Sequence, residues 1–354
     1  FFSSYINSEV FASSVGLLLL IIVMQCLVAV WNIYRKRKGI KYPVLLSILK
    51  DKSAHFIGII ALVFFIVSAI LSYHNKREMV QMFSLKTIGE VEHELTTPDC
   101  ATFYTPVYRL VFSLYANHLA AQQIDRLVEA KDRATVQSCT FDAKNIVLII
   151  GESMGPHHSQ QYGYFMNTTP RQVALEKSGL LVPFSDVVAP WNLTSFVFKN
   201  IFSMHVVGQK GEWCDYPLFP QLFRKAGYHV SFITNQFLPQ AKEAVYDFSG
   251  GFFLNHKELS ESMFDTRNTR LHTFDDGLLA DYDNKLKAEN KENNLIIFHL
   301  IGSHVSYNRR YPKSRKHFKA ADYEQKRPEL TKQRRYMLAH YDNAILYNDS
   351  IVDQ

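Results

Sequence analysis

Three short segments between residues 145 and 301 are rich in apolar residues. They cover residues 145–150, 228–234 and 295–301. Segments of this length that are rich in Ile and Val and lack polar alternation are typical of strands buried on both faces of a parallel sheet. From residue 145 onward strand-like and helix-like segments alternate, which predicts an α/β fold whose domain boundary falls at residues 140–144.

Each predicted strand ends in a polar side chain that can bind a metal ion or a phosphate. Glu152 follows the first strand after Gly151, Asn235 follows the second, and His304 follows the third. Ligands of open α/β sheets bind just outside the carboxyl ends of the strands, so the three side chains converge on the expected ligand site. Glu152 is therefore a metal ligand or an acid/base group, the alternative being a solvated carboxylate at a strand end.

Helical patterns surround the predicted strands. Residues 76–94 mix polar and apolar positions, and residues 105–131 begin with Thr105 as a cap and Pro106 in the first turn. The second of these helices suits either a membrane interface or ordinary packing. A polar, basic surface excursion is expected at residues 312–333, and a further helix from Gln333.

Two longer apolar stretches lie near the start of the chain. Residues 11–33 and 56–73 are almost uncharged, and each is about long enough to cross a bilayer core of roughly 30 Å. The alternative for the second stretch is a buried core helix. The connecting loop 34–55 is rich in Lys and Arg, so the positive-inside rule places it in the cytoplasm and everything after residue 73 outside it.

Charge and cysteine content narrow the possible partners. The net charge of +6 is largely that of the basic loop, and no nucleic-acid-binding motif accompanies it, so we expect no nucleic-acid partner. Of the four cysteines, Cys26 lies in the first predicted span. Cys100, Cys139 and Cys214 are left for the oxidising side, where we expect one disulfide with its pairing open.

These patterns divide the chain into three regions. Residues 1–75 form a transmembrane region, residues 76–143 a membrane-proximal helical linker, and residues 144–354 an α/β catalytic domain outside the cytoplasm. An external loop precedes the first predicted span, and the last residues fall inside a predicted helix. We therefore expect a fragment of a longer multi-pass protein, incomplete at both ends.

Thr194 is a candidate nucleophile, because it stands at the start of the apolar, helix-like run 196–204. A hydroxyl at this place is usually an N-cap that accepts hydrogen bonds from free backbone amides. The same amides and the partial positive charge of a helix N-terminus can instead hold a phosphate beside the hydroxyl. Ser195 is the neighbouring alternative.

Six groups of motifs follow one another along the chain. They are Ile146-Val-Leu-Ile-Ile-Gly-Glu-Ser153, Tyr162-Gly-Tyr164 with Thr168-Thr-Pro170, Thr194 before an apolar run, Ala226-Gly-Tyr-His-Val-Ser-Phe-Ile-Thr-Asn-Gln236, Gly302-Ser-His304 with Arg310-Tyr-Pro312, and Tyr341-Asp-Asn343 with Tyr347-Asn-Asp349. Together they resemble the motifs of the membrane-bound phosphoethanolamine transferases of the alkaline-phosphatase and sulfatase superfamily. The Thr-Asn-Gln ending, and a Thr194 without a preceding Cys-Gly, resemble the members that modify the lipopolysaccharide core more than those that modify lipid A.

The resemblance implies a doubly wound sulfatase-like sheet domain, incomplete at its C-terminus, and a catalytic role for three residues. Glu152 becomes a zinc ligand, and Thr194 becomes both a metal ligand and the nucleophile that is phosphorylated. His304 contacts the phosphoryl group or a second metal, or acts as general acid. The family's remaining zinc ligands, an Asp-His pair, are expected beyond residue 354.

The resemblance also implies the substrates and the location. The donor is phosphatidylethanolamine, the acceptor is a sugar or phosphate of lipopolysaccharide, and the domain faces the periplasm from a bacterial inner membrane. His157 and His158 are assigned to the loop after Glu152 rather than to the site.

Other functions remain open. A glycerol-phosphate transferase of the lipoteichoic acid synthase type shares the fold, the metal and the Thr. A catalytically silent membrane-tethered protein could keep the fold alone. A sulfatase activity is disfavoured, because the chain has no Cys-x-Pro-x-Arg sequence.

Overall fold

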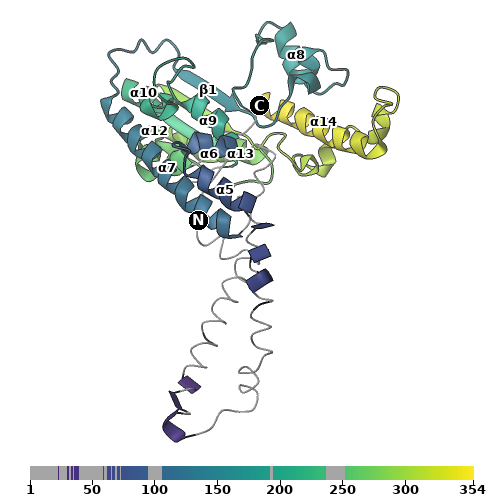
Figure 1. Cartoon of the computed structure of the whole chain (residues 1–354). Helices are drawn as coiled ribbons and strands as arrows, with labels where there is room; N and C mark the ends of the chain where they lie inside the picture. The colour runs from purple at the N-terminus through teal and green to yellow at the C-terminus, as the bar shows by residue number, and fades with distance from the viewer. Residues whose placement is uncertain are drawn as a thin grey trace. The chain divides into compact units, whose positions relative to one another are not determined.

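The structure is a computed structural model, and it describes residues 73–94, 106–191, 194–236 and 252–354, with scattered positions between 23 and 71 (Figure 1). The predicted spans 11–33 and 56–73 and the loop 34–55 lie largely outside the described residues. Among the described residues, no helix combines the length and the apolar character needed to cross a membrane. The chain divides into two compact units, one of Phe1–Gln122 with Lys242–Tyr246 and one of Gln123–Ala241 with Asp247–Gln354.

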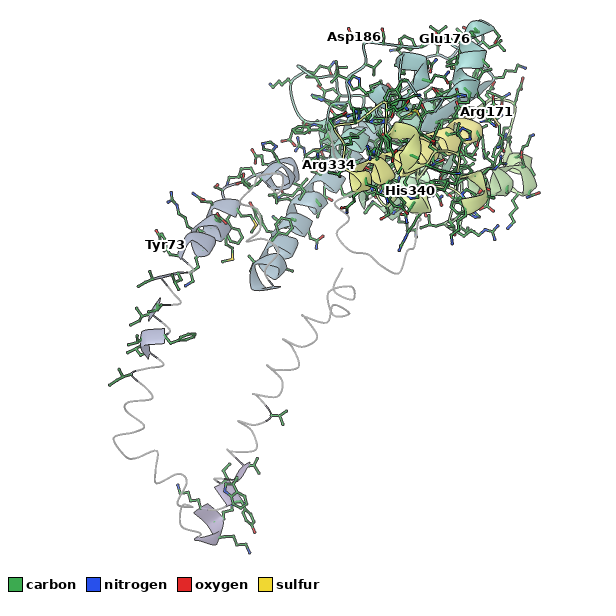
Figure 2. All side chains as sticks on the ribbon, turned by 90° about the vertical axis from the view of Figure 1, so that its right-hand side faces the viewer. Tyr73, Arg171, Glu176, Asp186, Arg334 and His340 are labelled. Carbon is green, nitrogen blue, oxygen red and sulfur yellow. The ribbon has the colours of Figure 1, made fainter. Side chains whose placement is uncertain are left out.

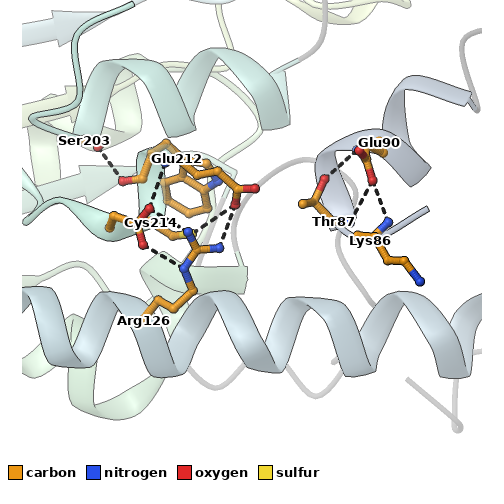
Figure 3. Close-up of polar contacts among 9 residues, drawn as sticks. Lys86, Thr87, Glu90, Arg126, Ser203, Glu212 and Cys214 are labelled. Atoms are coloured by element: carbon orange, nitrogen blue, oxygen red, sulfur yellow. Dashed lines mark hydrogen bonds and ion pairs between the residues drawn. The ribbon is translucent and has the colours of Figure 1, made fainter. Parts of the chain in front are cut away.

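In the first unit, the single helix predicted for residues 76–94 is wrong. Two helices occupy this stretch, α5 (Tyr73–Met82) and α6 (Ile88–Glu94). The Thr87 hydroxyl accepts a hydrogen bond from the Glu90 backbone, and the Glu90 carboxylate accepts hydrogen bonds from the amides of Lys86 and Thr87 (Figure 3). This is a capping box, which starts a new helix and so separates the two.

Helix α7 (Pro106–Arg133) confirms the long helix predicted after residue 105. Its cap Thr105 lies outside the described residues. In the first unit, the Tyr115 hydroxyl on this helix donates a hydrogen bond of 2.5 Å to the Leu85 carbonyl.

The second unit contains the predicted parallel sheet. Its strands are β1 (Asn145–Ile150), β2 (His229–Thr234), β3 (Thr266–Arg267) and β4 (Asn294–His299). All neighbouring strands are parallel, and the order is β1-β4-β2-β3. Because β4 lies between β1 and β2, the carboxyl ends of strands that are distant in sequence meet at one edge of the sheet.

Helices cover both faces of this sheet, as expected for a doubly wound domain. On one face lie α9 (Thr194–Phe202), α10 (Phe219–Ala226), α11 (Phe252–Asn255) and α12 (Lys257–Met263). On the other lie α13 (Asp276–Asn284) and α14 (Lys332–Val352). Helix α8 (Pro170–Lys177) packs against α14 instead. Short 3-10 helices connect them: Pro156–His158, Gln160–Tyr162, Trp213–Asp215, Leu286–Glu289, Tyr307–Arg309, Lys313–Arg315 and Ala320–Tyr323. In Figure 1, α9, α10 and α12 group together beside the sheet, and α14 is the long yellow helix.

The alternation of side chains along the central strands produces two separate cores. Phe232 of β2 and Ile297 of β4 pack with Phe198 and Phe202 of α9 on one face. Ile233 and Phe298 pack with side chains of α13 and α14 on the other. Strands β2 and β4 are therefore buried on both faces, as predicted for their apolar segments.

Strand β1 departs from the same prediction. It lies at an edge of the described sheet, and its exposure alternates along the strand. Ile146 and Leu148 pack against the core, whereas Val147 and Ile149 are 54% and 40% exposed. An apolar sequence predicts a strand well, but it does not show whether other strands and helices cover both of its faces.

Helix α14 confirms the helix predicted from Gln333, but the preceding segment 312–333 is anchored rather than a free surface excursion. Phe318 and Tyr323 are buried, and they pack with Met166 and with Ala339 of α14. The Asn343 side chain accepts hydrogen bonds from the backbone amides of His317 and Phe318. The exposed side chains of the segment include several Lys and Arg, and its buried aromatic side chains hold it in place.

Helix α8 is attached to α14 in a similar way. The Asp349 carboxylate accepts hydrogen bonds from the backbone amides of Arg171 and Gln172, at 3.0 and 3.1 Å. Figure 2 shows Arg171 beside α14, where its guanidinium also pairs with Asp349 and Asp353. The carboxylate thus satisfies two free amides in the first turn of α8.

In the second unit, Arg126 of α7 binds the acidic residues at the 3-10 helix Trp213–Asp215. Arg126 makes hydrogen bonds of 2.8 and 2.6 Å to the two carboxylate oxygens of Asp215, and a further bond of 2.8 Å to Glu212 (Figure 3).

Neighbouring Cys214 and the exposed Cys139 are free thiols, so the expected disulfide is absent between these two. Cys100 and Cys26 lie outside the described residues.

The core around Phe202 generates a stability prediction. The ring is fully buried, and its centroid lies 5.3 to 6.0 Å from those of Phe219, Phe232 and Phe253. Phe202→Ala should lower the free energy of unfolding by about 3–5 kcal/mol, because it leaves a cavity that the neighbours cannot fill. Urea unfolding followed by tryptophan fluorescence measures this loss. Leu180→Ala, at a position 78% exposed, should change stability by less than about 0.5 kcal/mol, and equal losses in both variants would contradict the assignment of the core.

Candidate active site

The carboxyl end of β1 and the amino end of α9 bring two of the predicted site residues together. The Thr194 hydroxyl donates a hydrogen bond of 3.1 Å to Oε2 of Glu152. The other carboxylate oxygen accepts a bond of 3.0 Å from the Ser153 hydroxyl. Both Glu152 and Thr194 are partly exposed, so the pair is open to a ligand.

Thr194 is the first residue of α9, as the pattern of the sequence indicates. A helix N-terminus carries free amide donors and a partial positive charge, which together favour an anion. Buried Phe198 and Phe202, one and two turns further on, hold the helix against the sheet. The backbone of Ser195 belongs to the same helix, while its side chain lies outside the described part of the structure.

The turn after β4 lies directly against Glu152. Gly302 has φ of +49°, and a Cβ at this position would lie 2.9 Å from the Glu152 nitrogen and 3.0 Å from its carbonyl oxygen. The amide and hydroxyl of Ser303 donate hydrogen bonds of 3.1 and 3.2 Å to the Glu152 carbonyl. The sequence predicted a role for the histidine of the Gly-Ser-His motif, but not this role of the glycine and the serine.

His304 follows this turn, and one nitrogen of its ring has no partner among the described residues. Its backbone is held by hydrogen bonds to Ile301 and from Arg310. Nδ1 of its ring is buried, and no described residue forms a hydrogen bond with it. A buried ring nitrogen without a partner is costly, so a bound group is the natural partner for this atom.

The third strand-end residue, Asn235, does not join the site. Its side chain is buried, and it donates to Asp275 at 3.0 Å and accepts from the His272 amide at 2.7 Å. The expected convergence of three polar strand ends on a ligand is therefore wrong for Asn235. The residue instead ties β2 to Asp275, which lies 40 positions away and carries no recognisable motif.

His158 also has a partner within the protein. Its Nδ1 lies 3.0 Å from Oδ1 of Asp342, a fully buried carboxylate that also accepts hydrogen bonds from the hydroxyls of Tyr164 and Tyr323. Burial and the negative charge of Asp342 raise the pKa of Tyr164 and Tyr323, so both remain protonated donors. Tyr341 bonds to the backbone of Ser153 and Gly155, so α14 braces the loop after Glu152 from the other side.

Glu152, Thr194 and His304 offer a carboxylate, a hydroxyl and an imidazole, the kinds of donor that zinc accepts. The two oxygen ligands are close enough to share one ion, and the unpartnered nitrogen of His304 fits an additional bound group. Across the part of the chain that the structure describes, no cluster of three His, Cys, Asp or Glu side chains could hold a metal. The residues thus fit part of a zinc site.

A basic hollow of about 650 Å³ lies elsewhere, at the amino end of β2. Three of its four Lys and Arg side chains have partners. Arg224 pairs with Asp265, Lys131 with Glu258, and Lys225 donates to backbone carbonyls at the end of α7.

Several relatives of this chain are phosphoethanolamine transferases by name. Phosphoethanolamine transferase EptC of Escherichia coli O18:K1:H7 (strain RS218 / NMEC) is 28% identical over 212 residues, which are 60% of this chain and 36% of the relative. Phosphoethanolamine transferase CptA of Salmonella typhimurium is 27% identical over 218 residues, 60% of this chain and 37% of the relative. The chain thus spans little more than a third of the length of these relatives.

Among solved structures, the zinc complex of the C-terminal periplasmic domain of EptC from Escherichia coli is similar to this chain. The two are 26% identical with a TM-score of 0.48, and the match covers 59% of this chain and 57% of the other.

The family model described as Sulfatase matches residues 144–354, which are more than half of the chain. That match and the parallel sheet confirm the alkaline-phosphatase-like part of the predicted fold. The chain belongs to the sulfatase family.

Proposed function

We propose that this chain transfers phosphoethanolamine from phosphatidylethanolamine to a sugar or phosphate of lipopolysaccharide, through a covalent intermediate on Thr194. The observation that carries this proposal is the hydrogen bond between the Thr194 hydroxyl and Glu152 at the start of α9. The names of the relatives support the choice of the transferred group.

In the first step, Thr194 Oγ1 attacks the phosphorus of the donor phosphodiester. The proton of the Thr194 hydroxyl passes to solvent water, the new bond joins Thr194 to phosphorus, and the bond to the diacylglycerol oxygen breaks with its electron pair on that oxygen. Because the Thr194 hydrogen points at Glu152 Oε2, the lone pairs of the hydroxyl are free to face the substrate. The phosphoryl oxygens lie against the amides at the start of α9.

In the second step, an oxygen of the acceptor attacks the phosphothreonine and the bond to Thr194 breaks. The acceptor's proton passes to the His304 ring, which donated one in the first step, Thr194 Oγ1 takes a proton from solvent water, and phosphoethanolamine is left on the acceptor. His304 would protonate the diacylglycerol oxygen in the first step through its ring, which has an unpartnered nitrogen.

Glu152 and Thr194 are the proposed zinc ligands, with His304 beside the phosphoryl group. A bound zinc ion would lower the pKa of the threonine hydroxyl and offset the negative charge of the phosphodiester. The protein side chains then act by placement: Glu152 orients Thr194, and α9 directs it at the phosphorus.

The proposed setting is a bacterial inner membrane. Residues 11–33 and 56–73 would span it, with the loop 34–55 in the cytoplasm. Residues 76–143 would then link the membrane to a catalytic domain of residues 144–354 in the periplasm, where both the donor lipid and the acceptor are within reach.

Thr194→Ala should abolish the covalent intermediate, because it removes the attacking oxygen. The loss of one partly exposed hydrogen bond should cost only about 1 kcal/mol, too little to unfold the domain. Intact mass spectrometry after incubation with phosphatidylethanolamine measures the adduct. Thr194→Ser, which keeps the hydroxyl, should still form it.

An adduct that persists in Thr194→Ala would assign the nucleophile to another residue, Ser195 first. An adduct with the mass of glycerol phosphate in the unchanged protein, given a glycerophospholipid donor, would instead favour the lipoteichoic acid type of reaction.

Glu152→Gln should lose zinc and transfer together, since a neutral amide is a much weaker ligand than a carboxylate of the same shape. Elemental analysis and the transfer assay measure the two losses. Glu292→Gln, at an exposed carboxylate that pairs with Lys144, is the control and should lose neither. Full zinc content without transfer would make Glu152 an acid/base group rather than a ligand.

A further inference from the structure

We propose that Asp275 and Gly302 are positioning residues that together fix the place of Glu152 at the site. The inference rests on the proposed function, in which Glu152 is a zinc ligand. Neither residue would touch the metal or the substrate, and both would act through the backbone of Glu152.

Asp275 fixes the turn that follows β4. Its carboxylate is 3% exposed. One oxygen accepts hydrogen bonds from the Asn235 side chain at 3.0 Å and the Ile301 amide at 2.9 Å, and the other accepts from the Gly302 amide at 2.9 Å. Three donors from two strand ends thus converge on one buried carboxylate, which determines the direction in which the chain leaves β4.

Gly302 transmits this placement to Glu152. Its backbone approaches Glu152 so closely that a Cβ would lie 2.9 Å from the Glu152 nitrogen, and the atoms in the way are backbone atoms that cannot rotate aside. The amide and hydroxyl of Ser303 bond to the Glu152 carbonyl from the same turn. A shift of this turn must therefore shift Glu152.

The geometry distinguishes this role from ordinary packing. Most buried side chains stabilise the domain without touching the segment that carries a site residue, and their loss is felt mainly as a loss of stability. The turn at Gly302 touches Glu152 itself. Residues that orient a ligand from behind typically change metal affinity by 10–100-fold when they are replaced.

Two matched pairs of variants in the full-length protein test the inference. Gly302→Ala is compared with Gly179→Ala, because Gly179 also has a positive φ, +75°, but open space around its Cβ. Asp275→Asn is compared with Asp349→Asn, because Asp349 is likewise buried and accepts two backbone amides, those at the start of α8. Zinc affinity is measured by chelator competition, and stability by urea unfolding.

We expect Gly302→Ala and Asp275→Asn to bind zinc about 10–100-fold more weakly than the unchanged protein. The two controls should stay within about twofold in zinc affinity, even where they lose a similar amount of stability. If Gly302→Ala does not fold, Asp275→Asn carries the test.

The outcomes separate this inference from the proposed function. If Glu152→Gln loses zinc while Gly302→Ala and Asp275→Asn retain it, the positioning role is overturned and the ligand assignment stands. If Glu152→Gln itself binds zinc like the unchanged protein, the ligand assignment fails, and the positioning role fails with it. An equal loss of affinity in the controls would show a general effect of stability and would also overturn the inference.

Discussion

The parallel pairing of β1 with β4 is the constraint on which the rest of the site depends. The two strands stay in register up to Ile150 and His299, and one more hydrogen bond joins Leu300 to the Ile150 carbonyl. Beyond this point the two segments separate, and the backbones of Glu152 and Gly302 lie in close contact. The position of Glu152 therefore depends on where the hydrogen bonding between β1 and β4 ends, because the turns after both strands begin at that point.

Local sequence signals predicted the elements well. The apolar segments at 145–150 and 295–301 are strands, Pro106 begins α7, and the chain from Lys332 is helical. The family resemblance assigned Glu152 and Thr194 to one site, and the structure places their side chains in contact. These features depend on neighbours in sequence or on a motif, so they can be read without knowledge of the packing.

Features that depend on distant neighbours could not be predicted in the same way. Asn235 was expected to face a ligand, and instead it bonds to Asp275. The exposure of β1 follows from its place at an edge, which its composition does not reveal. The break between α5 and α6 is a different case, because the capping sequence from Thr87 to Glu90 was present and its meaning was overlooked.

Helix α9 has the proposed nucleophile, Thr194, as its first residue and the buried Phe202 as its last. Phe202 lies eight residues after Thr194, a distance of about 12 Å at the rise of an α-helix. A movement at one end of the helix is therefore felt at the other. A tilt of about 10° about the Phe202 end would displace the Thr194 hydroxyl by roughly 2 Å. A misplacement of even about 1 Å can slow an enzymatic reaction about a hundredfold. For the proposed reaction, a substitution in this core would therefore misplace Thr194 as well as lower the stability of the fold.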